Sequence, residues 1–256
     1  MIDISANLAG IKSPNPFWLA SAPPTNSGYQ VMKAFDAGWG GAVWKTLGVP
    51  VINVSSRYGA VHYRDTRIMG FNNIELITDR PLVDNLLEIE EVKKYFPDHA
   101  VIASLMVDTR AEWHQIVKDV QNAGADGIEL NFGCPHGMCE RGMGSAVGQN
   151  PEALATITSW VMEVANIPVI VKLTPNITDI REPARAAKAG GGDAISLINT
   201  IQSPFCSHSA DFAKQTYISQ VGIFDEDRNL LGIAKVSRPV RKVEDNAYTF
   251  KLKLDL

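Results

Sequence analysis

The sequence of 256 residues contains little cysteine: Cys134, Cys139 and Cys206 are the three present. Three cysteines are too few for a disulfide framework in a chain of this size, and reduced thiols are typical of cytoplasmic proteins. Because an iron–sulfur cluster of the common type needs four cysteine ligands, we expect no such cluster in this chain.

The sequence also lacks long hydrophobic runs and an excess of positive charge. No apolar run approaches the roughly 20 residues that cross a bilayer, and residues 1–13 have neither the basic start nor the apolar stretch of a signal peptide. Lys and Arg number 24 against 28 Asp and Glu, a net charge of -4. We therefore expect a cytoplasmic protein that binds neither nucleic acid nor membranes. Hydrophobic residues make up 45% of the chain, enough for a packed core.

Residues 1–203 show a regular alternation of short apolar runs and amphipathic segments, which is typical of βα units around a parallel sheet. The predicted strands are residues 17–20, 42–46, 101–106, 127–132, 169–173 and 194–199. The predicted helices are residues 28–37, 81–95, 110–123, 151–165 and 180–189. Three of these helices end in Ala-Gly, where glycine suits the left-handed residue that closes a helix, and Asn150-Pro151 resembles an N-cap followed by proline at the first helical position.

Polar residues gather at the carboxyl ends of the predicted strands, the edge where barrels and open α/β sheets bind ligands. They are Lys45, Thr46, Asn131, Cys134, Lys172, Asn199 and Thr200. Polar residues can also simply end a strand. A buried lysine needs an anion or a polarised ring, and either a flavin or a neighbouring carboxylate would satisfy Lys45 and Lys172.

Residues 129–144 form a strand that runs into a glycine-rich loop with a cysteine. Asn131 offers both a donor and an acceptor, which suits a cyclic amide substrate. Cys134 could be a nucleophile, a general acid, a metal ligand or a buried apolar residue. Cys134, His136 and Cys139 could form a metal site, but their spacing is not that of a common zinc site.

Two segments interrupt this pattern. Residues 49–78 are predicted to be an insertion of short strands and loop. From about Ser203 strands follow one another without helices, at residues 217–224, 230–236 and 248–256. We therefore predict a partial barrel over residues 1–203, a junction over residues 204–212 and a β-strand-rich tail over residues 213–256.

Several motifs of residues 1–203 together resemble the dihydropyrimidine dehydrogenases, and most closely their bacterial catalytic subunit, within the wider dihydroorotate dehydrogenase-like family. The motifs are Ala20-Ser21-Ala22-Pro23-Pro24-Thr25, Gly38-Trp39-Gly40, Lys45-Thr46, Asn72-Asn73-Ile74-Glu75-Leu76-Ile77, Asn131-Phe132-Gly133-Cys134-Pro135-His136-Gly137-Met138, Glu140-Arg141-Gly142-Met143-Gly144, Lys172-Leu173-Thr174-Pro175-Asn176 and Asn199-Thr200. The tail does not share this resemblance.

The resemblance implies an α/β fold of the (β/α)8 TIM-barrel type that binds FMN and reduces the 5,6 double bond of uracil or thymine. By analogy, reduced FMN delivers hydride to the pyrimidine C6 and Cys134 protonates C5 as a general acid. The resemblance assigns the pyrimidine to Asn73, Glu75, Asn131, Asn199 and Thr200. It assigns the flavin to Ala20, Ser21, Lys45, Thr46 and Lys172. We predict no metal ligands, because of the spacing noted above.

The resemblance ends near Ser203, so we expect the barrel to be truncated after its sixth strand, without the units that normally bind the flavin phosphate. The open edges that result would be covered by the tail or by a partner in an oligomer. Because no dinucleotide-binding glycine motif opens a helix, electrons from NADH or NADPH would need a partner reductase subunit. The alternative functions are a catalytically inactive barrel fragment whose β tail serves assembly and, with less support, a metal-binding module.

Overall fold

The computed structural model describes residues 2–50, 58–63, 65–71, 76–134, 142–199, 217–224 and 230–241. The chain divides into two compact units, residues 1–202 and 203–256. In the second unit, strands β11 (Tyr217–Phe224) and β12 (Leu230–Arg241) form an antiparallel hairpin. Both strands were predicted, although β12 extends five residues beyond residue 236, where its predicted end lay. The predicted strand over residues 248–256 lies outside the described residues.

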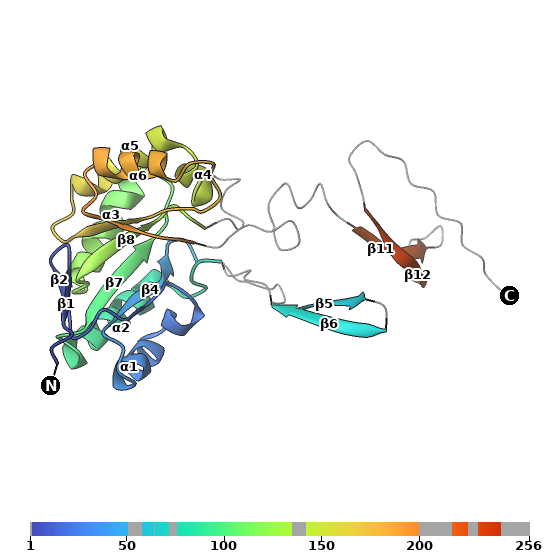
Figure 1. Cartoon of the computed structure of the whole chain (residues 1–256), viewed down its shortest axis with the longest axis horizontal. Coiled ribbons are helices and arrows are strands. Elements are labelled where there is room, and N and C mark those ends of the chain that lie inside the picture. Colours follow the sequence, from blue (N-terminus) through green and yellow to red (C-terminus); the bar gives the residue numbers. More distant parts are fainter. Residues whose placement is uncertain are drawn as a thin grey trace. The chain divides into compact units, whose positions relative to one another are not determined.

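The first unit is built on a six-stranded parallel sheet with the order β10-β9-β8-β7-β4-β3 (Figure 1). Its strands in chain order are β3 (Trp18–Leu19), β4 (Gly41–Leu47), β7 (Ala100–Leu105), β8 (Gly127–Asn131), β9 (Val169–Lys172) and β10 (Ala194–Ser196). Spatial order follows chain order without reversal. This is the winding of a barrel and not of a doubly wound sheet. The predicted α/β fold of TIM-barrel type is therefore confirmed for this unit.

Five helices connect these strands, each within three residues of its predicted bounds: α1 (Gly28–Asp36), α2 (Leu82–Tyr95), α3 (Arg110–Asn122), α5 (Pro151–Met162) and α6 (Arg181–Ala189). The predicted N-cap at Asn150 is confirmed, because its side chain accepts a hydrogen bond from the Ala153 N–H. Left-handed glycines follow α1 and α3 as predicted, at Gly38 and Gly124. After α6 the prediction was wrong by one position: Gly190 stays helical and Gly191 is left-handed.

The chain contains further short elements outside the parallel sheet. The strands β1 (Ala6–Leu8) and β2 (Ile11–Ser13) form an antiparallel hairpin that was not predicted. The short helices η1 (Pro23–Thr25) and α4 (Ser145–Gly148) were also missed. The predicted insertion contains a second hairpin, of β5 (Tyr58–Tyr63) and β6 (Thr66–Phe71).

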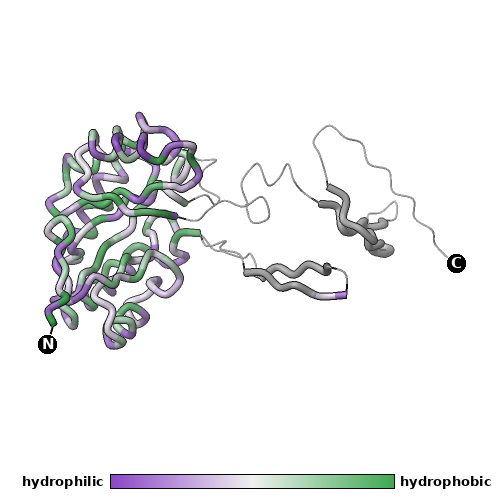
Figure 2. Tube along the Cα trace, viewed as in Figure 1, coloured by the Kyte–Doolittle hydropathy of each residue, from purple (hydrophilic) through white to green (hydrophobic). Residues whose placement is uncertain are grey.

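The two faces of the sheet have separate cores. The helices pack on one face, where they bury Trp44, Ala103, Leu130 and Val171 of the strands among their own apolar residues. The opposite, inner face holds a smaller apolar cluster near the amino ends of the strands, formed by Ile11, Val43, Ala100, Ile102 and Ile170. Figure 2 shows hydrophobic residues following the strands through the centre of the unit. Along the inner face, the side chains become polar toward the carboxyl ends of the strands.

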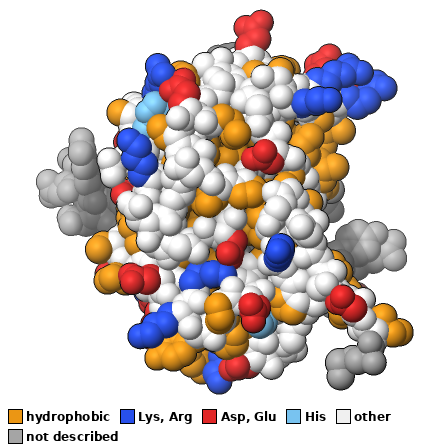
Figure 3. Space-filling model, turned by 90° about the vertical axis from the view of Figure 1, so that its left-hand side faces the viewer, with side chains coloured by type: hydrophobic (Ala, Val, Ile, Leu, Met, Phe, Trp, Pro, Cys, Tyr) orange, Lys and Arg blue, Asp and Glu red, His pale blue; other side chains and the backbone are white. Residues whose placement is uncertain are grey.

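In the part of the chain that the structure describes, none of the helices combines the length and the apolar character needed to traverse a bilayer. On the face in Figure 3, both basic and acidic side chains are present, with apolar ones between them.

Candidate active site

A continuous row of polar contacts crosses the inner face at the carboxyl ends of the strands. Thr46 of β4 is its centre: its hydroxyl lies 3.2 Å from the Ser21 hydroxyl, 3.0 Å from the Ser104 hydroxyl and 2.9 Å from the Asn131 amide nitrogen. Asn199, which follows β10, donates a hydrogen bond of 2.9 Å to the carbonyl oxygen of Asn131. Side-chain contacts thus connect residues that follow the two edge strands of the sheet, Ser21 after β3 and Asn199 after β10.

An irregularity in β4 explains why two consecutive residues of this strand are available there. Trp44 pairs with Ala103 of β7 and Leu47 pairs with Leu105, so Lys45 and Thr46 lie together opposite the single residue Ser104. An extra residue of this kind is a β-bulge, which changes where side chains point. Lys45 and Thr46 are 5% and 4% exposed, so both polar side chains are buried at the strand end.

A buried ion pair lies in the same row. The Lys172 ammonium of β9 is 3.6 Å from the Glu129 carboxylate of β8, and the two side chains are 8% and 3% exposed. The Glu129 carboxylate also accepts a 3.0 Å hydrogen bond from the Ser104 hydroxyl. Burial raises the pKa of the Glu129 carboxyl above its ordinary value, although the Lys172 ammonium and the Ser104 hydroxyl oppose that rise.

The approach of Asn199 to Asn131 depends on a glycine. A Cβ atom on Gly133 would lie 2.4 Å from the Cβ of Asn199, closer than two carbon atoms can stand. The Gly133 N–H also donates a hydrogen bond of 3.3 Å to the side-chain oxygen (Oδ1) of Asn131. Gly133 therefore lets the segment after β10 cross directly over the end of β8.

Cys134 lies just beyond this crossing and is 6% exposed. Its neighbours form a small apolar cluster of Ile77, Met106 and Met143. Its backbone carbonyl accepts a hydrogen bond from the Ser145 N–H at the start of α4, at 2.9 Å. The short helix thus holds the backbone of Cys134 at the strand end, and the apolar side chains exclude water from around it.

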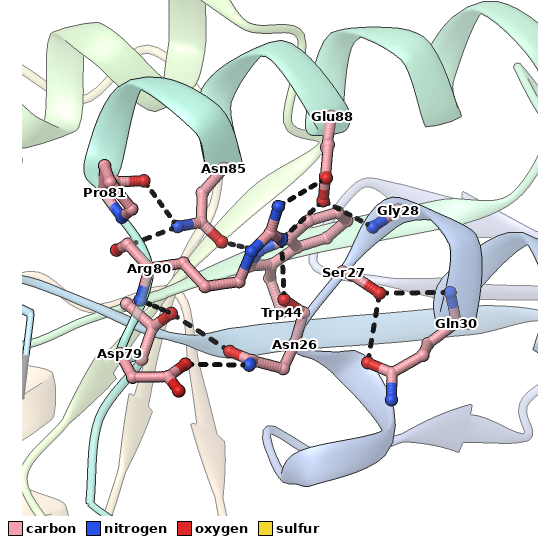
Figure 4. Close-up of polar contacts among 11 residues, drawn as sticks. Asn26, Ser27, Gly28, Gln30, Trp44, Asp79, Arg80, Pro81, Asn85 and Glu88 are labelled. Atoms are coloured by element: carbon pink, nitrogen blue, oxygen red, sulfur yellow. Dashed lines mark hydrogen bonds and ion pairs between the residues drawn. The ribbon is translucent and has the colours of Figure 1, made fainter. Parts of the chain in front are cut away.

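Ala20 and Ser21 follow β3 directly, and Ala20 is exposed whereas Ser21 is partly buried. The contacts that fix the segment after them are drawn in Figure 4. Arg80 donates to the backbone carbonyl of Asn26 at 2.9 Å and forms a two-pronged ion pair with Glu88 of α2. The Glu88 carboxylate in turn accepts a 2.7 Å hydrogen bond from the Gly28 N–H at the start of α1.

The segment that leads into α2 is held by the same residues. The Thr78 hydroxyl donates to the side-chain oxygen of Asn26 at 3.0 Å, and the Thr78 N–H donates to the Thr46 carbonyl at 2.9 Å. Asn85 of α2, which is fully buried, accepts from the Trp44 indole at 2.9 Å (Figure 4). These contacts fix the chain before β4 and the chain before α2 against the strand that carries Lys45 and Thr46.

The structure therefore brings together Ser21, Thr46, Asn131, Lys172 and Asn199 of the predicted site, with Lys45 and Cys134 at the same strand ends. Asn73, Glu75 and Thr200 lie outside the described residues, as do His136 and Cys139 of the metal alternative. Within the described ranges, no three His, Cys, Asp or Glu side chains are grouped as a metal would need.

Sequence reasoning missed two members of the row, Ser104 and Glu129. Both are at most 2% exposed. Their signal was a polar residue inside an otherwise apolar strand, which is costly unless the residue is paired. That signal is visible in Gly127-Ile128-Glu129-Leu130-Asn131.

A groove of about 680 Å³ lies at the opposite ends of the strands, between the β1–β2 hairpin and the loops before β7 and β8. Lys12, Asp98 and Asp126 are its charged lining residues. The Asp126 carboxylate already contacts the Lys93 ammonium and the Val101 N–H, both at 2.8 Å. Of the predicted site residues that the structure describes, none lines this groove, so we place the candidate site at the carboxyl edge.

Comparison with known proteins gives a family match over most of the chain. The family model described as dihydroorotate dehydrogenase matches residues 4–223, past the boundary predicted near Ser203 and into β11. The chain is 46% identical over 211 residues to dihydropyrimidine dehydrogenase (NADP(+)), chloroplastic, of Arabidopsis thaliana, covering 78% of this chain and 49% of that protein. It is 44% identical over 202 residues to the NAD-dependent dihydropyrimidine dehydrogenase subunit PreA of Escherichia coli, with the same coverage.

Two more distant matches are named as dihydroorotate dehydrogenases. The catalytic subunit of dihydroorotate dehydrogenase B (NAD(+)) from Thermoplasma acidophilum is 32% identical over 205 residues, 79% of this chain and 64% of that protein. A crystal structure of DHODH from Eimeria tenella in complex with ferulenol superposes with a TM-score of 0.61 at 18% identity, over 79% of this chain and 61% of that one. The last match supports the fold alone. The chain spans about half the length of the dihydropyrimidine dehydrogenases it matches.

Proposed function

Because the chain belongs to the dihydroorotate dehydrogenase family, we propose that it is the FMN-dependent part of an oxidoreductase that reduces the 5,6 double bond of uracil or thymine. The observation that carries this proposal is the buried row of polar side chains at the carboxyl edge of the sheet. It contains the amides of Asn131 and Asn199 beside the Lys172 ammonium. The identity of 44–46% to dihydropyrimidine dehydrogenases favours a pyrimidine over other substrates.

The donors of this row fit a flavin. The N1/O2 edge of an isoalloxazine ring carries negative charge when reduced and is matched by a cation, and Lys45 and Lys172 are both buried at these strand ends. Ser21 and Thr46 add hydroxyl groups that can bond the ring's polar atoms. Ala20, which is small and exposed, would let the ring approach the backbone. FMN, when bound, would supply the hydride for the reduction.

The pyrimidine would be bound by amide groups. Its two carbonyls and two ring N–H groups need both donors and acceptors, and Asn side chains provide each from one group. Asn131 and Asn199 already lie within 2.9 Å of one another on the inner face. We assign the remaining contacts to Asn73, Glu75 and Thr200.

Cys134 would deliver the proton to C5 of the pyrimidine, on the carbon next to the one that accepts hydride. The reduction adds one hydride and one proton, so a proton donor is required at that carbon. The Cys134 thiol lies at the strand end beside apolar residues, away from competing water. The held backbone of Cys134 would keep the donor in position from one turnover to the next.

The remaining expectations belong to this proposal as well. We propose that electrons reach the flavin from a partner reductase subunit that uses NADH or NADPH, and that the protein is a cytoplasmic oligomer. The relatives named above include one described as a subunit. We also propose that residues 213–256 form a β-strand-rich part distinct from the barrel of residues 1–203, joined to it by residues 204–212.

An anaerobic half-reaction tests the function without the partner. The chain is loaded with FMN, the flavin is reduced chemically, and uracil, thymine or orotate is added while the flavin absorption is followed. We expect uracil and thymine to reoxidise the flavin with formation of the dihydropyrimidine, whereas orotate does not. Reoxidation by orotate alone would instead indicate the chemistry of the dihydroorotate dehydrogenases.

The matched variants are Cys134→Ala and Cys134→Ser. Both should bind FMN as the unmodified chain does, and Cys134→Ala should slow reoxidation by about 100-fold or more, the usual size of a general-acid effect. A chain that binds no FMN would support the inactive fragment with a β tail. Metal bound in stoichiometric amount would support the metal-binding module.

A further inference from the structure

Glu129 is a buried carboxylate for which the proposed reaction has no use. It lies in the middle of the apolar strand β8 and is 2% exposed. Burying a charge in this way costs stability even when a partner is present. Three groups contact the carboxylate: the Ser104 hydroxyl, the Lys172 ammonium and the side chain of Ser196 in β10. Ser104 and Lys172 belong to the row of the candidate site.

The carboxylate determines the direction of the hydrogen bonds in that row. The Ser104 hydroxyl donates its hydrogen to Glu129, and it has no alternative at pH values above the raised pKa of Glu129, where the ionised carboxylate can only accept. The Thr46 hydroxyl, 3.0 Å away, must then donate to Ser104. The lone pairs of Thr46 are left to accept, and the Asn131 amide donates to them at 2.9 Å. One charge thus sets the orientation of three side chains in sequence.

The orientation of Asn131 limits what this side chain offers to a bound ring. Its carbonyl oxygen accepts from the Asn199 amide at 2.9 Å and from the Gly133 N–H at 3.3 Å, which uses both lone pairs. One of its amide hydrogens goes to Thr46. The other is a donor, and a donor meets a carbonyl oxygen of a pyrimidine and not a ring N–H.

We propose that Glu129 is a positioning residue of this site: its carboxylate orients Asn131 through Ser104 and Thr46 as a donor toward a substrate carbonyl, and it holds the Lys172 ammonium. The orientation of Asn131 belongs to the protein without any ligand, whereas its use toward a carbonyl rests on the proposed function. A carboxylate that served packing alone would leave the direction of the hydrogen bonds undetermined.

The side-chain amide resonances of Asn131 test the first half of the proposal in the chain without ligand. Their assignment comes from their loss in Asn131→Asp. We expect Glu129→Gln to shift both resonances, because a glutamine can donate to Ser104 and reverse the row. Glu129→Asp keeps the charge and should leave them near their original positions. The control Glu90→Gln removes an exposed carboxylate of α2 and should leave them unchanged.

Ser104→Ala provides a second break in the row that leaves the contact between Glu129 and Lys172 in place. It too should shift the Asn131 resonances, and it keeps the test decisive if Glu129→Gln does not fold. Asn131 resonances that stay in place in Ser104→Ala, or in a folded Glu129→Gln chain, would overturn the proposal.

Titration with FMN tests the contact with Lys172. We expect Glu129→Gln to weaken FMN binding about tenfold and Glu129→Asp to weaken it less, while Glu90→Gln binds as the unmodified chain does. Unchanged affinity in Glu129→Gln would overturn the role of Glu129 toward Lys172. If the unmodified chain binds no FMN, the proposed function fails, whereas the resonances still decide whether Glu129 orients Asn131.

Discussion

The two faces of the parallel sheet are built from alternate residues of the same strands, yet they bury different kinds of side chain. The helix-covered face is apolar from one end of the strands to the other, with Trp44, Ala103, Leu130 and Val171. The inner face begins with Val43, Ile102 and Ile170. Within two or three residues along β4, β7 and β9, it changes to buried polar and charged groups.

This difference separates two tasks within one element. Apolar burial on the helix-covered face stabilises the fold at roughly 25 cal/mol per Å². Buried polar groups on the inner face contribute little net stability, and an ion pair such as that of Glu129 and Lys172 can lower it. Groups that cost stability and are nevertheless joined into one row indicate a site, because their arrangement has a use other than folding.

Removal of one charge from the inner face should reduce the free energy of unfolding more than the other changes considered below. Lys172→Met leaves the Glu129 carboxylate buried without its cation, and we expect the free energy of unfolding to fall by about 4 kcal/mol at neutral pH. Urea denaturation measures it. The double variant Lys172→Met/Glu129→Gln should recover most of the loss, since it removes both charges. A single variant as stable as the unmodified chain would contradict a buried ion pair.

A cavity on the helix-covered face should cause the second largest loss in the free energy of unfolding. Leu130→Ala removes a fully buried side chain next to Glu129 in the same strand, and we expect a loss of about 3 kcal/mol in the same measurement. Leu87→Ala on α2 is the control, because Leu87 is 61% exposed, and its effect should stay within about 0.5 kcal/mol. Equal losses in both variants would show that the helix-covered face is not the main core.

The pH dependence of stability distinguishes the two faces further. The pKa of Glu129 is raised from its ordinary value of 4.5 by burial, so the folded chain keeps this proton at pH values where the unfolded chain has lost it. Stability from this group is therefore lost as pH rises above about 4.5. Glu129→Gln should remove that slope, which is at most about 1.4 kcal/mol per pH unit. Parallel stability curves for the two chains at all pH values above 4.5 would refute it.

The half-buried and exposed ion pairs should contribute least to the free energy of unfolding. Arg80→Gln removes the half-buried ion pair with Glu88 (Figure 4), and we expect a loss of about 1 kcal/mol. Arg80 lowers the pKa of Glu88 from its ordinary value of 4.5, so this stability is present above that pH and is lost as pH falls through the lowered value. Arg110→Gln, which breaks the exposed pair with Glu163, should cause no measurable change. A larger effect at Arg110 than at Arg80 would reverse this ranking.

The sequence was sufficient to predict the helices and strands of the sheet because nearly continuous apolar runs and Ala-Gly helix ends mark them. It could not show the β1–β2 hairpin, whose strands have three residues each, or the four-residue helix α4. Elements this short carry too few residues for a periodic pattern.

The candidate site was predicted only in part, because some of its residues are marked by local sequence and others are placed by strand pairing. Asn131 and Lys172 end their strands and Asn199 follows β10, so they stand out as polar residues after apolar ones. Ser104 belongs to the candidate site because it lies opposite Glu129 in the register of β7 and β8, and this pairing cannot be read from the sequence. The bulge that sets Lys45 and Thr46 together opposite Ser104 arises from strand pairing and has no local signature in the sequence.

The most direct test of the division between the two faces is an FMN titration of the unmodified chain, Thr46→Val and Leu130→Ala, at a temperature where all three are folded. Thr46→Val keeps the shape of the side chain and removes the hydroxyl at the centre of the row. We predict that the unmodified chain and Leu130→Ala bind FMN with the same affinity, whereas Thr46→Val binds about tenfold more weakly. Equal weakening in both variants, or unchanged binding in Thr46→Val, would contradict it.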